Sequence, residues 1–255
     1  MENKFIWIKD LLFELVRKDI KVKYKRSILG VAWSILNPLL MMIVMSIVFS
    51  YLFRFQIKNY PIYILSGIIF WNFFSTSTNL ASLSLISNAS LLKKVYFPRY
   101  LLIFSTAISQ FINLLYALIP LIIIMFIYKT PPKLSFILLP IPILSLLLFT
   151  IGLSLILSIL SAYFTDISYI YQIILLAWIY LTPIFYPPSI VPDKYKIFLQ
   201  INPMYHIILS LREVIYLGEF PSLNTLSISF IFSFSIFLFG LWFFRINENK
   251  VMYLL

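Results

Sequence analysis

The chain has 255 residues, of which 62% are hydrophobic and 11% are charged, so it has too few polar side chains to cover a soluble globule of this size. Its 20 basic and 9 acidic residues give a formal charge of +11, and eight of the cations precede Gly30. This distribution is typical of a protein that contacts membrane lipids and not nucleic acid. Cysteine is absent, which excludes disulfides and thiolate metal sites.

Residues 1–29 are expected to form a cytoplasmic interface segment built on a helix over residues 5–26. The basic stretch RKDIKVKYKR is followed closely by the uncharged run VAWSILNPLLMMIVMSIVFSYLF, and the positive-inside bias places the N-terminus in the cytoplasm. The pattern predicts an amphipathic helix in the membrane interface, either a simple anchor or also a docking surface for a partner. At 100° per residue, four charged residues share one narrow arc: Asp10, Glu14, Arg17 and Lys21.

Six uncharged segments are long enough to cross a bilayer as helices, which requires about 20 residues at a rise of about 1.5 Å each. They cover residues 31–53, 61–86, 100–127, 134–161, 169–186 and 223–244. An even number of spans returns the C-terminus to the cytoplasm. The sequence therefore predicts an all-α, multi-pass protein of the inner (cytoplasmic) membrane, with a single transmembrane domain over residues 1–255 and both termini cytoplasmic.

A short basic segment follows the second span, and residues 87–98 lie in the cytoplasm in this topology. Ser87 or Asn88 can cap a two-turn helix that ends before the next proline, with Lys93 and Lys94 near its C-terminus, where the helix dipole favours cations. The segment has the features of an ordinary loop that obeys the charge rule. It also has the shape of a coupling helix that contacts a soluble protein.

Residues 187–222 form a long, proline-rich external segment between the last two spans. Its apolar pieces KIFLQI and MYHIILSLREVIYL are too short to cross, so they are expected to be re-entrant or interfacial half-helices that act as an external gate. His206, Arg212 and Glu213 fall in this segment, where they form either an external acid/base cluster or ordinary structural contacts.

The spans carry aromatic stripes. Such stripes are typical of helix packing and interfacial belts. They also suit a glycan that slides through a channel, because sugars present apolar C–H faces to aromatic rings. The residues of interest are Trp33, Phe49 and Phe53 in the first span and Tyr171, Trp178 and Phe185, which recur every seven residues, in the fifth.

Uncharged polar residues recur at helical spacing in the second and third spans. They either hydrogen-bond one helix to another or line a wet pore. These residues are Asn72, Ser75, Thr76 and Asn79, followed by Thr106, Gln110 and Asn113.

Several kinds of chemistry have no matching motif. An ATP-binding P-loop requires G-x-x-x-x-G-K-[ST], whereas no two of the five glycines here are five residues apart, so the chain is not expected to hydrolyse ATP by that route. No acidic residue falls within a span, which argues against an ion-driven secondary transporter. There is no D-x-D and no H-E-x-x-H, so we expect no catalytic residues, no metal and no cofactor in this chain.

Four ordered blocks, which extend over essentially the whole chain, resemble a known family. They are RKDIKVKYKRSILGVAWSILNPLL, YPIYILSGIIFWNFF, NASLLKKVYFPR and the NPM of the external segment. Together they are similar to ABC-2 type permeases that export polysaccharides, and especially to the channel subunits of O-antigen exporters. Teichoic-acid and capsule exporters are near relatives of that group.

The resemblance implies a homodimer whose two copies form a channel, with two separate ATPase subunits that bind ATP and Mg²⁺. It implies that the aromatic residues of the first and fifth spans line the channel. It also implies coupling to the ATPase through a set of residues on the first helix and the loop between the second and third spans. That set is Asp10, Glu14, Arg17, Asn88, Leu91, Leu92, Lys93 and Lys94.

The turn at Leu29 and Gly30 resembles a loop that receives a lipid-linked pyrophosphate, beside cations that suit phosphate. Attraction to anionic headgroups explains the same cations. The cations are Lys21, Lys23, Lys25 and Arg26.

The function implied is ATP-driven export of an undecaprenyl-linked, O-antigen-type polysaccharide. One alternative is a permease of the same fold for teichoic acid, capsule, small molecules or lipids. An alternative of another class is a membrane enzyme that acts on polyprenyl-linked sugars, for which an external acid such as Glu213 would be the residue to test.

Overall fold

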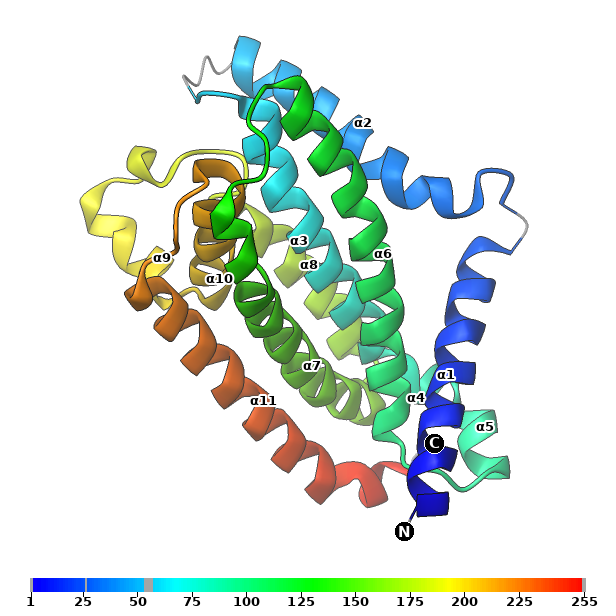
Figure 1. Ribbon diagram of the computed structural model, residues 1–255. Helices are drawn as coiled ribbons and strands as arrows, with labels where there is room; N and C mark the ends of the chain where they lie inside the picture. The colour runs from blue at the N-terminus through cyan, green and yellow to red at the C-terminus, as the bar shows by residue number, and fades with distance from the viewer. Residues whose placement is uncertain (1, 26, 53–56, 254–255) are drawn as a thin grey trace.

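The structure is a computed structural model that describes residues 2–25, 27–52 and 57–253 (Figure 1). The described residues contain helices and connecting loops but no strand. The α-helices are α1 (Glu2–Tyr24), α2 (Trp33–Ile47), α3 (Tyr60–Ser82), α4 (Ser84–Ser87), α5 (Ala89–Lys94), α6 (Tyr100–Ile127), α7 (Pro140–Tyr163), α8 (Asp166–Leu181), α9 (Lys196–Ile201), α10 (Pro203–Arg212) and α11 (Leu223–Val251). Short 3₁₀ turns cover Gly30–Ala32, Leu134–Leu138, Pro188–Ile190 and Asp193–Tyr195, and π turns cover Val48–Leu52 and Glu213–Leu217.

Within the described residues, four helical segments are long and apolar enough to cross a membrane. The helix α3 is not among them although it has 23 residues, because polar side chains such as Asn72 and Asn79 lower its hydropathy. The helix α8 has 16 residues, fewer than the roughly 20 that a span perpendicular to the bilayer needs. The chain is therefore a multi-pass, all-helical membrane protein. The four segments are Ala32–Ser50, Tyr100–Ile127, Leu134–Tyr163 and Leu223–Val251.

The helix α3 lies at the centre of the bundle and contacts α2, α6, α7, α8 and α10. Ile64, Phe70 and Phe74 on this helix are fully buried. Because neighbouring helices surround α3, its polar side chains need not face lipid.

The helices α7 and α11 pack with their backbones unusually close. A Cβ atom on Gly152 would lie 2.6 Å from the backbone nitrogen of Phe237, and a Cβ on Gly240 would collide with the Gly152 carbonyl oxygen. Small residues permit this approach, which is a common way to associate helices in membranes. Several buried hydroxyl groups bond to their own helix, as in the 2.6 Å bond from Ser233 to the Ser229 carbonyl, whereas those of Ser154 and Ser161 on α7 have no partner among the described residues.

Figure 1 shows that α1 begins and α11 ends at the same end of the molecule, beside α4 and α5, whereas α9 and α10 lie towards the opposite end. Arg99, just before α6, donates to the Glu248 carbonyl (3.1 Å) and to the Asn249 amide oxygen (2.9 Å) near the end of α11. This contact joins the end of α11 to the start of α6.

Candidate functional site

The helix α1 packs against α6 and is not confined to the end of the molecule where it starts. Ser105 of α6 donates to the Asp19 carboxylate (3.3 Å), and the Lys23 amine donates to the Gln110 side chain (3.1 Å). Gln110 lies ten residues beyond Tyr100, so at about 1.5 Å per residue the amine meets α6 roughly 15 Å from that helix's first residue. The end of α1 thus reaches well along a span.

The turn between α1 and α2 depends on a glycine. Gly30 has a φ of +49°, in the left-handed region that side chains disfavour, and its N–H donates to the Ser27 hydroxyl (3.0 Å). Leu29 beside it is exposed. This turn sets the start of α2 against α6 and α3, and a cavity of about 300 Å³ lies between these helices and the end of α1.

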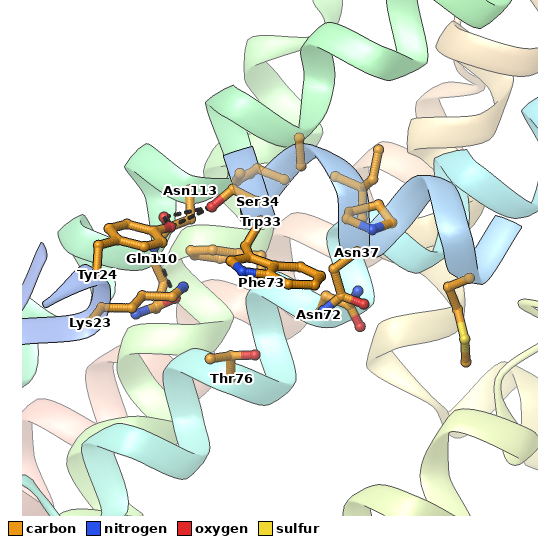
Figure 2. A pocket seen from close by; sticks show the side chains of 15 residues that line it. Lys23, Tyr24, Trp33, Ser34, Asn37, Asn72, Phe73, Thr76, Gln110 and Asn113 are labelled. Atoms are coloured by element: carbon orange, nitrogen blue, oxygen red, sulfur yellow. Dashed lines mark hydrogen bonds between the residues drawn. The ribbon is translucent and has the colours of Figure 1, made fainter. Parts of the chain in front are cut away.

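Polar side chains lie at both ends of the cavity, with aromatic rings between them (Figure 2). Figure 2 shows Lys23 and Tyr24 at one end, Asn37 and Asn72 at the other, and Trp33 between them. The lining is Lys23, Tyr24, Trp33, Ser34, Asn37, Pro38, Met41, Ile69, Asn72, Phe73, Thr76, Gln110, Asn113, Leu114 and Ala117.

One wall of the cavity is a closed hydrogen-bond network. The Tyr24 hydroxyl donates to the Asn113 amide oxygen (2.5 Å), and the Ser34 hydroxyl lies 3.1 Å from the same oxygen and also contacts the Tyr24 hydroxyl. The Asn113 amide nitrogen donates to Gln110 (3.2 Å), which also accepts from Lys23. The polar stripe of α6 therefore bonds one helix to another, joining α6 to α1 and α2.

The two charged side chains Lys23 and Asp19 of α1 differ in their charged neighbours. Burial lowers the pKa of the Lys23 ammonium, and no acidic side chain lines the cavity. Burial also raises the pKa of the Asp19 carboxyl, which nearby Lys18 opposes. Amides, hydroxyls and a lysine are poor ligands for a divalent cation, and they suit an uncharged, hydrogen-bonding group better.

A second cluster surrounds Arg212, in the segment that the sequence predicts to be external. Its guanidinium stacks 3.6 Å from the ring centre of Tyr63 and donates to the Tyr63 hydroxyl (2.8 Å). It also donates to the carbonyl oxygens of Pro183 (2.5 Å), Ile184 (2.7 Å) and Tyr63 (3.2 Å). These groups fasten α10 to α3 and to the end of α8. Arg212 is buried and both of its terminal nitrogens donate to protein acceptors, whereas its Nε has no acceptor among the described residues. It is no part of an exposed acid/base cluster.

The NPM sequence begins α10. Asn202 accepts from the Met204 N–H (3.1 Å) as an N-cap, and the same oxygen accepts from the Trp178 indole (2.9 Å). His206 is buried and its Nε2 donates to the Gln200 carbonyl oxygen (2.7 Å). Glu213 instead accepts from Thr225 at the start of α11 (2.9 Å). His206, Arg212 and Glu213 therefore make separate structural contacts.

A family model for ABC-2 type transporters matches residues 10–216. The chain belongs to the ABC-2 type transporter family. It is thus a transporter permease subunit and not an enzyme, and an ABC transporter pairs such a subunit with an ATPase.

Curated relatives of this ABC-2 permease have informative names. The chain is 33% identical over 255 residues to an O-antigen export system permease protein RfbA of Klebsiella pneumoniae, covering 99% of this chain and 96% of the relative. It is 31% identical to the RfbA permease of Myxococcus xanthus, covering 85% and 84%. A polysialic acid transport protein, KpsM of Escherichia coli, is 22% identical over 93% of both chains.

In this ABC-2 permease, the residues expected to couple to an ATPase lie at one end. Asp10, Glu14 and Arg17 are exposed on α1, and Lys93 and Lys94 are exposed in the last turn of α5. Leu92 is buried and Leu91 is partly buried, so they hold α5 against the bundle.

Asn88 precedes α5, but its side chain does not cap the helix. Its amide oxygen accepts from Lys18 of α1 (2.9 Å), and its amide nitrogen donates to the Ser84 carbonyl (2.8 Å). The bond to α1 replaces the expected cap, because one amide oxygen is used by the nearby cation. As a result, α1 and α5 are joined directly.

The residues expected to meet a lipid pyrophosphate do not gather around one point. Lys21 and Lys25 are exposed near the end of α1, Lys23 turns towards Gln110, and Leu29 and Gly30 form the following turn. Arg26 lies outside the described residues. Only Lys23 of this group lines the cavity.

The aromatic stripe of the fifth span faces the interior of the subunit. Tyr171 is buried and donates to Thr78 (2.7 Å), and Phe185 is buried and stacks on Phe49. Trp178 packs edge-on against Phe74. Tyr171 and Trp178 lie seven residues apart on α8, whereas Phe185 follows the end of that helix at Leu181; all three rings contact other parts of the same subunit. The expectation that these residues line a channel stays a prediction.

Trp33 is half-exposed and lines the cavity, whereas Phe53 lies outside the described residues. Sequence reasoning did not single out Tyr24, Ser34 or Asn37. The available signal was Asn37, an amide one turn after Trp33 in an otherwise apolar run, because residues four apart share a helix face.

Proposed function

We propose that this chain is the membrane subunit of an ATP-driven exporter that moves an O-antigen-type polysaccharide, carried on a polyprenyl lipid, across the inner membrane. The observation that carries this proposal is the 33% identity to an O-antigen export permease over almost the full length of both proteins. Sugar hydroxyls left unpaired in hydrocarbon cost several kcal/mol each by transfer estimates, so a glycan needs a shielded path.

The fold supports six crossings in this proposal, with both termini cytoplasmic. Four helices have the length and hydropathy of spans, and α3 and α8 provide the other two. The shorter α8 crosses with help from the external segment packed at its end, where Asn202 contacts Trp178 and Thr182. The shared end of α1 and α11 agrees with an even number of crossings.

Two copies are proposed to assemble around the transport path. The helix α8 exposes Ile173, Ile174 and Leu176 together with the polar Gln172. A glutamine that faces lipid is costly, whereas one that faces a water-filled path between two copies can be solvated. In this arrangement α2 and α8 are the helices closest to the path.

The ATPase is proposed to contact α5 and the first turns of α1. Replacing Lys93 and Lys94 by Glu should reduce co-purification with the ATPase and ATP hydrolysis by the complex by about tenfold, because interface charges steer association. The matched control is replacement of Lys58 and Lys194, which are exposed outside α1 and α5, by Glu. Equal losses in both variants would remove α5 from the interface.

A deletion strain tests the function itself. Without this chain, lipid-linked glycan should accumulate on the cytoplasmic side, and surface polysaccharide should be lost and then restored by the wild-type gene. Normal surface polymer in the deletion strain would refute the export role.

A capsule exporter is the second candidate, favoured by the 22% identity to a polysialic acid transport protein over 93% of the chain. The two functions differ in what disappears from the cell surface. Loss of capsule with intact lipopolysaccharide side chains in the deletion strain would favour this alternative.

A further inference from the structure

The cavity between α1, α2, α3 and α6 has a second wall whose polar side chains have no partners. Trp33 and Asn37 lie one turn apart on α2, and Asn72 and Thr76 lie one turn apart on α3. In the part of the chain that the structure describes, none of these four side chains makes a hydrogen bond. They contrast with Tyr24, Ser34, Gln110 and Asn113 on the first wall, which satisfy one another.

Most other hydroxyl groups of α3 bond to their own helix, although the buried Ser77 hydroxyl has no partner among the described residues. Ser66 donates to the Tyr63 carbonyl (2.9 Å), Thr78 to the Phe74 carbonyl (2.8 Å) and Ser82 to the Asn79 carbonyl (2.7 Å). Thr76 makes no such bond and is exposed to the cavity. Unpaired polar groups inside a membrane protein cost free energy, so this wall is suited to water or to a ligand with hydrogen-bonding groups.

The chemistry of the wall indicates the class of ligand. Two amides and one hydroxyl both donate and accept hydrogen bonds, as sugar hydroxyls do. The half-exposed indole of Trp33 offers an apolar face and a donor beside them. Phosphate would favour arginine forks or several cations, whereas Lys23 is the single cation among the described residues that line the cavity and already donates to Gln110.

We propose that this cavity binds one sugar ring of the lipid-linked glycan, with its C–H face on Trp33 and its hydroxyls on Asn37, Asn72 and Thr76. A volume of about 300 Å³ lies at the lower end of ligand pockets and suits a single ring better than a chain. The cavity is built by one subunit, so each copy carries its own sugar subsite. This inference rests on the proposed export function and adds a recognition step to it.

Binding to the purified full-length protein in lipid nanodiscs tests the subsite. The probes are polyprenyl pyrophosphate bearing one N-acetylhexosamine, the same lipid without sugar, and phosphatidylglycerol as a polyol headgroup. Wild-type protein should bind the sugar-bearing lipid at least tenfold more tightly than the bare lipid. Tryptophan fluorescence should respond to the sugar, and Trp33→Phe should remove that response.

The near-isosteric variants Asn72→Leu and Thr76→Val should lower the sugar-dependent preference by about tenfold together, and Asn37→Leu tests the opposite helix. Ser75→Ala is the matched control, because its hydroxyl bonds to its own helix (3.4 Å to the Asn72 carbonyl) and does not line the cavity. Unfolding temperatures identify any variant that fails to fold.

Equal binding of the two polyprenyl lipids, a preserved preference in the double variant, or equally tight binding of phosphatidylglycerol would overturn the subsite. The outcome is separable from the function, since a wild-type complex that exports glycan without any sugar preference refutes only the subsite. A complex that binds the sugar but exports no glycan in cells refutes the proposed function alone.

Discussion

Lys23 and Arg212 both extend between helices, and neither forms an ion pair with an acid among the described residues. Arg212 donates to a hydroxyl and three carbonyl oxygens and stacks on Tyr63, so both of its terminal nitrogens have protein acceptors. Lys23 has one side-chain acceptor and borders a cavity in which several polar groups are unpaired. Arg212 therefore holds parts of the protein together, whereas the unpaired polar groups of the cavity beside Lys23 are available to bind a ligand.

The largest loss of stability should come from replacing Arg212. Arg212→Leu leaves the carbonyls of Pro183 and Ile184 and the Tyr63 hydroxyl without their donor, and should destabilise the protein by about 3 kcal/mol or more. Thermal unfolding in detergent, followed by intrinsic fluorescence, measures the loss. Arg212→Lys keeps the charge but not the planar fork, so an intermediate loss is expected. An unchanged unfolding temperature in Arg212→Leu would break the comparison.

A smaller loss of stability is expected from adding a methyl group at Gly67, which lies beside the same guanidinium. A Cβ atom on Gly67 would lie 2.8 Å from an Arg212 nitrogen, so Gly67→Ala should cost about 1–3 kcal/mol through overpacking. The double variant with Arg212→Leu is the control. If the two sites interact directly, Gly67→Ala should cost less in that background, and simple additivity would argue against the contact.

On the closed wall of the cavity, Tyr24→Phe removes one hydroxyl that serves Asn113 and contacts Ser34. The expected loss of stability is about 1 kcal/mol, the usual worth of one hydrogen bond. Tyr128→Phe, at an exposed position near the end of α6, should leave the unfolding temperature unchanged. Equal behaviour of the two variants would show that the closed network contributes nothing to stability.

The smallest effect is expected on the open wall. Thr76→Val and Asn72→Leu remove groups without protein partners, so each should change stability by less than about 0.5 kcal/mol or increase it slightly. Comparing each unfolding curve with that of Ser75→Ala checks this. A loss comparable to that of Tyr24→Phe would mean that these side chains have structural partners, which would contradict the proposed difference between the two walls.

Much of the fold follows from local patterns. The uncharged runs and the basic residues after Asn88 predicted long helices and the short helix α5, whereas the start of α10 after Asn202 was not predicted. The six-crossing topology stays a prediction, because α3 and α8 fall short in hydropathy or length. Local signals suffice for helices since apolar length and helix ends depend on neighbouring residues.

Only the tertiary structure determines what each helix face contacts. Asn72 and Thr76 on one helix and Gln110 and Asn113 on another have the same kind of spacing, yet the first pair faces a cavity and the second bonds to α1. Periodicity establishes that side chains share a face. What lies opposite that face depends on residues almost ninety positions away in the sequence, such as Tyr24 opposite Asn113, and no local pattern contains that information.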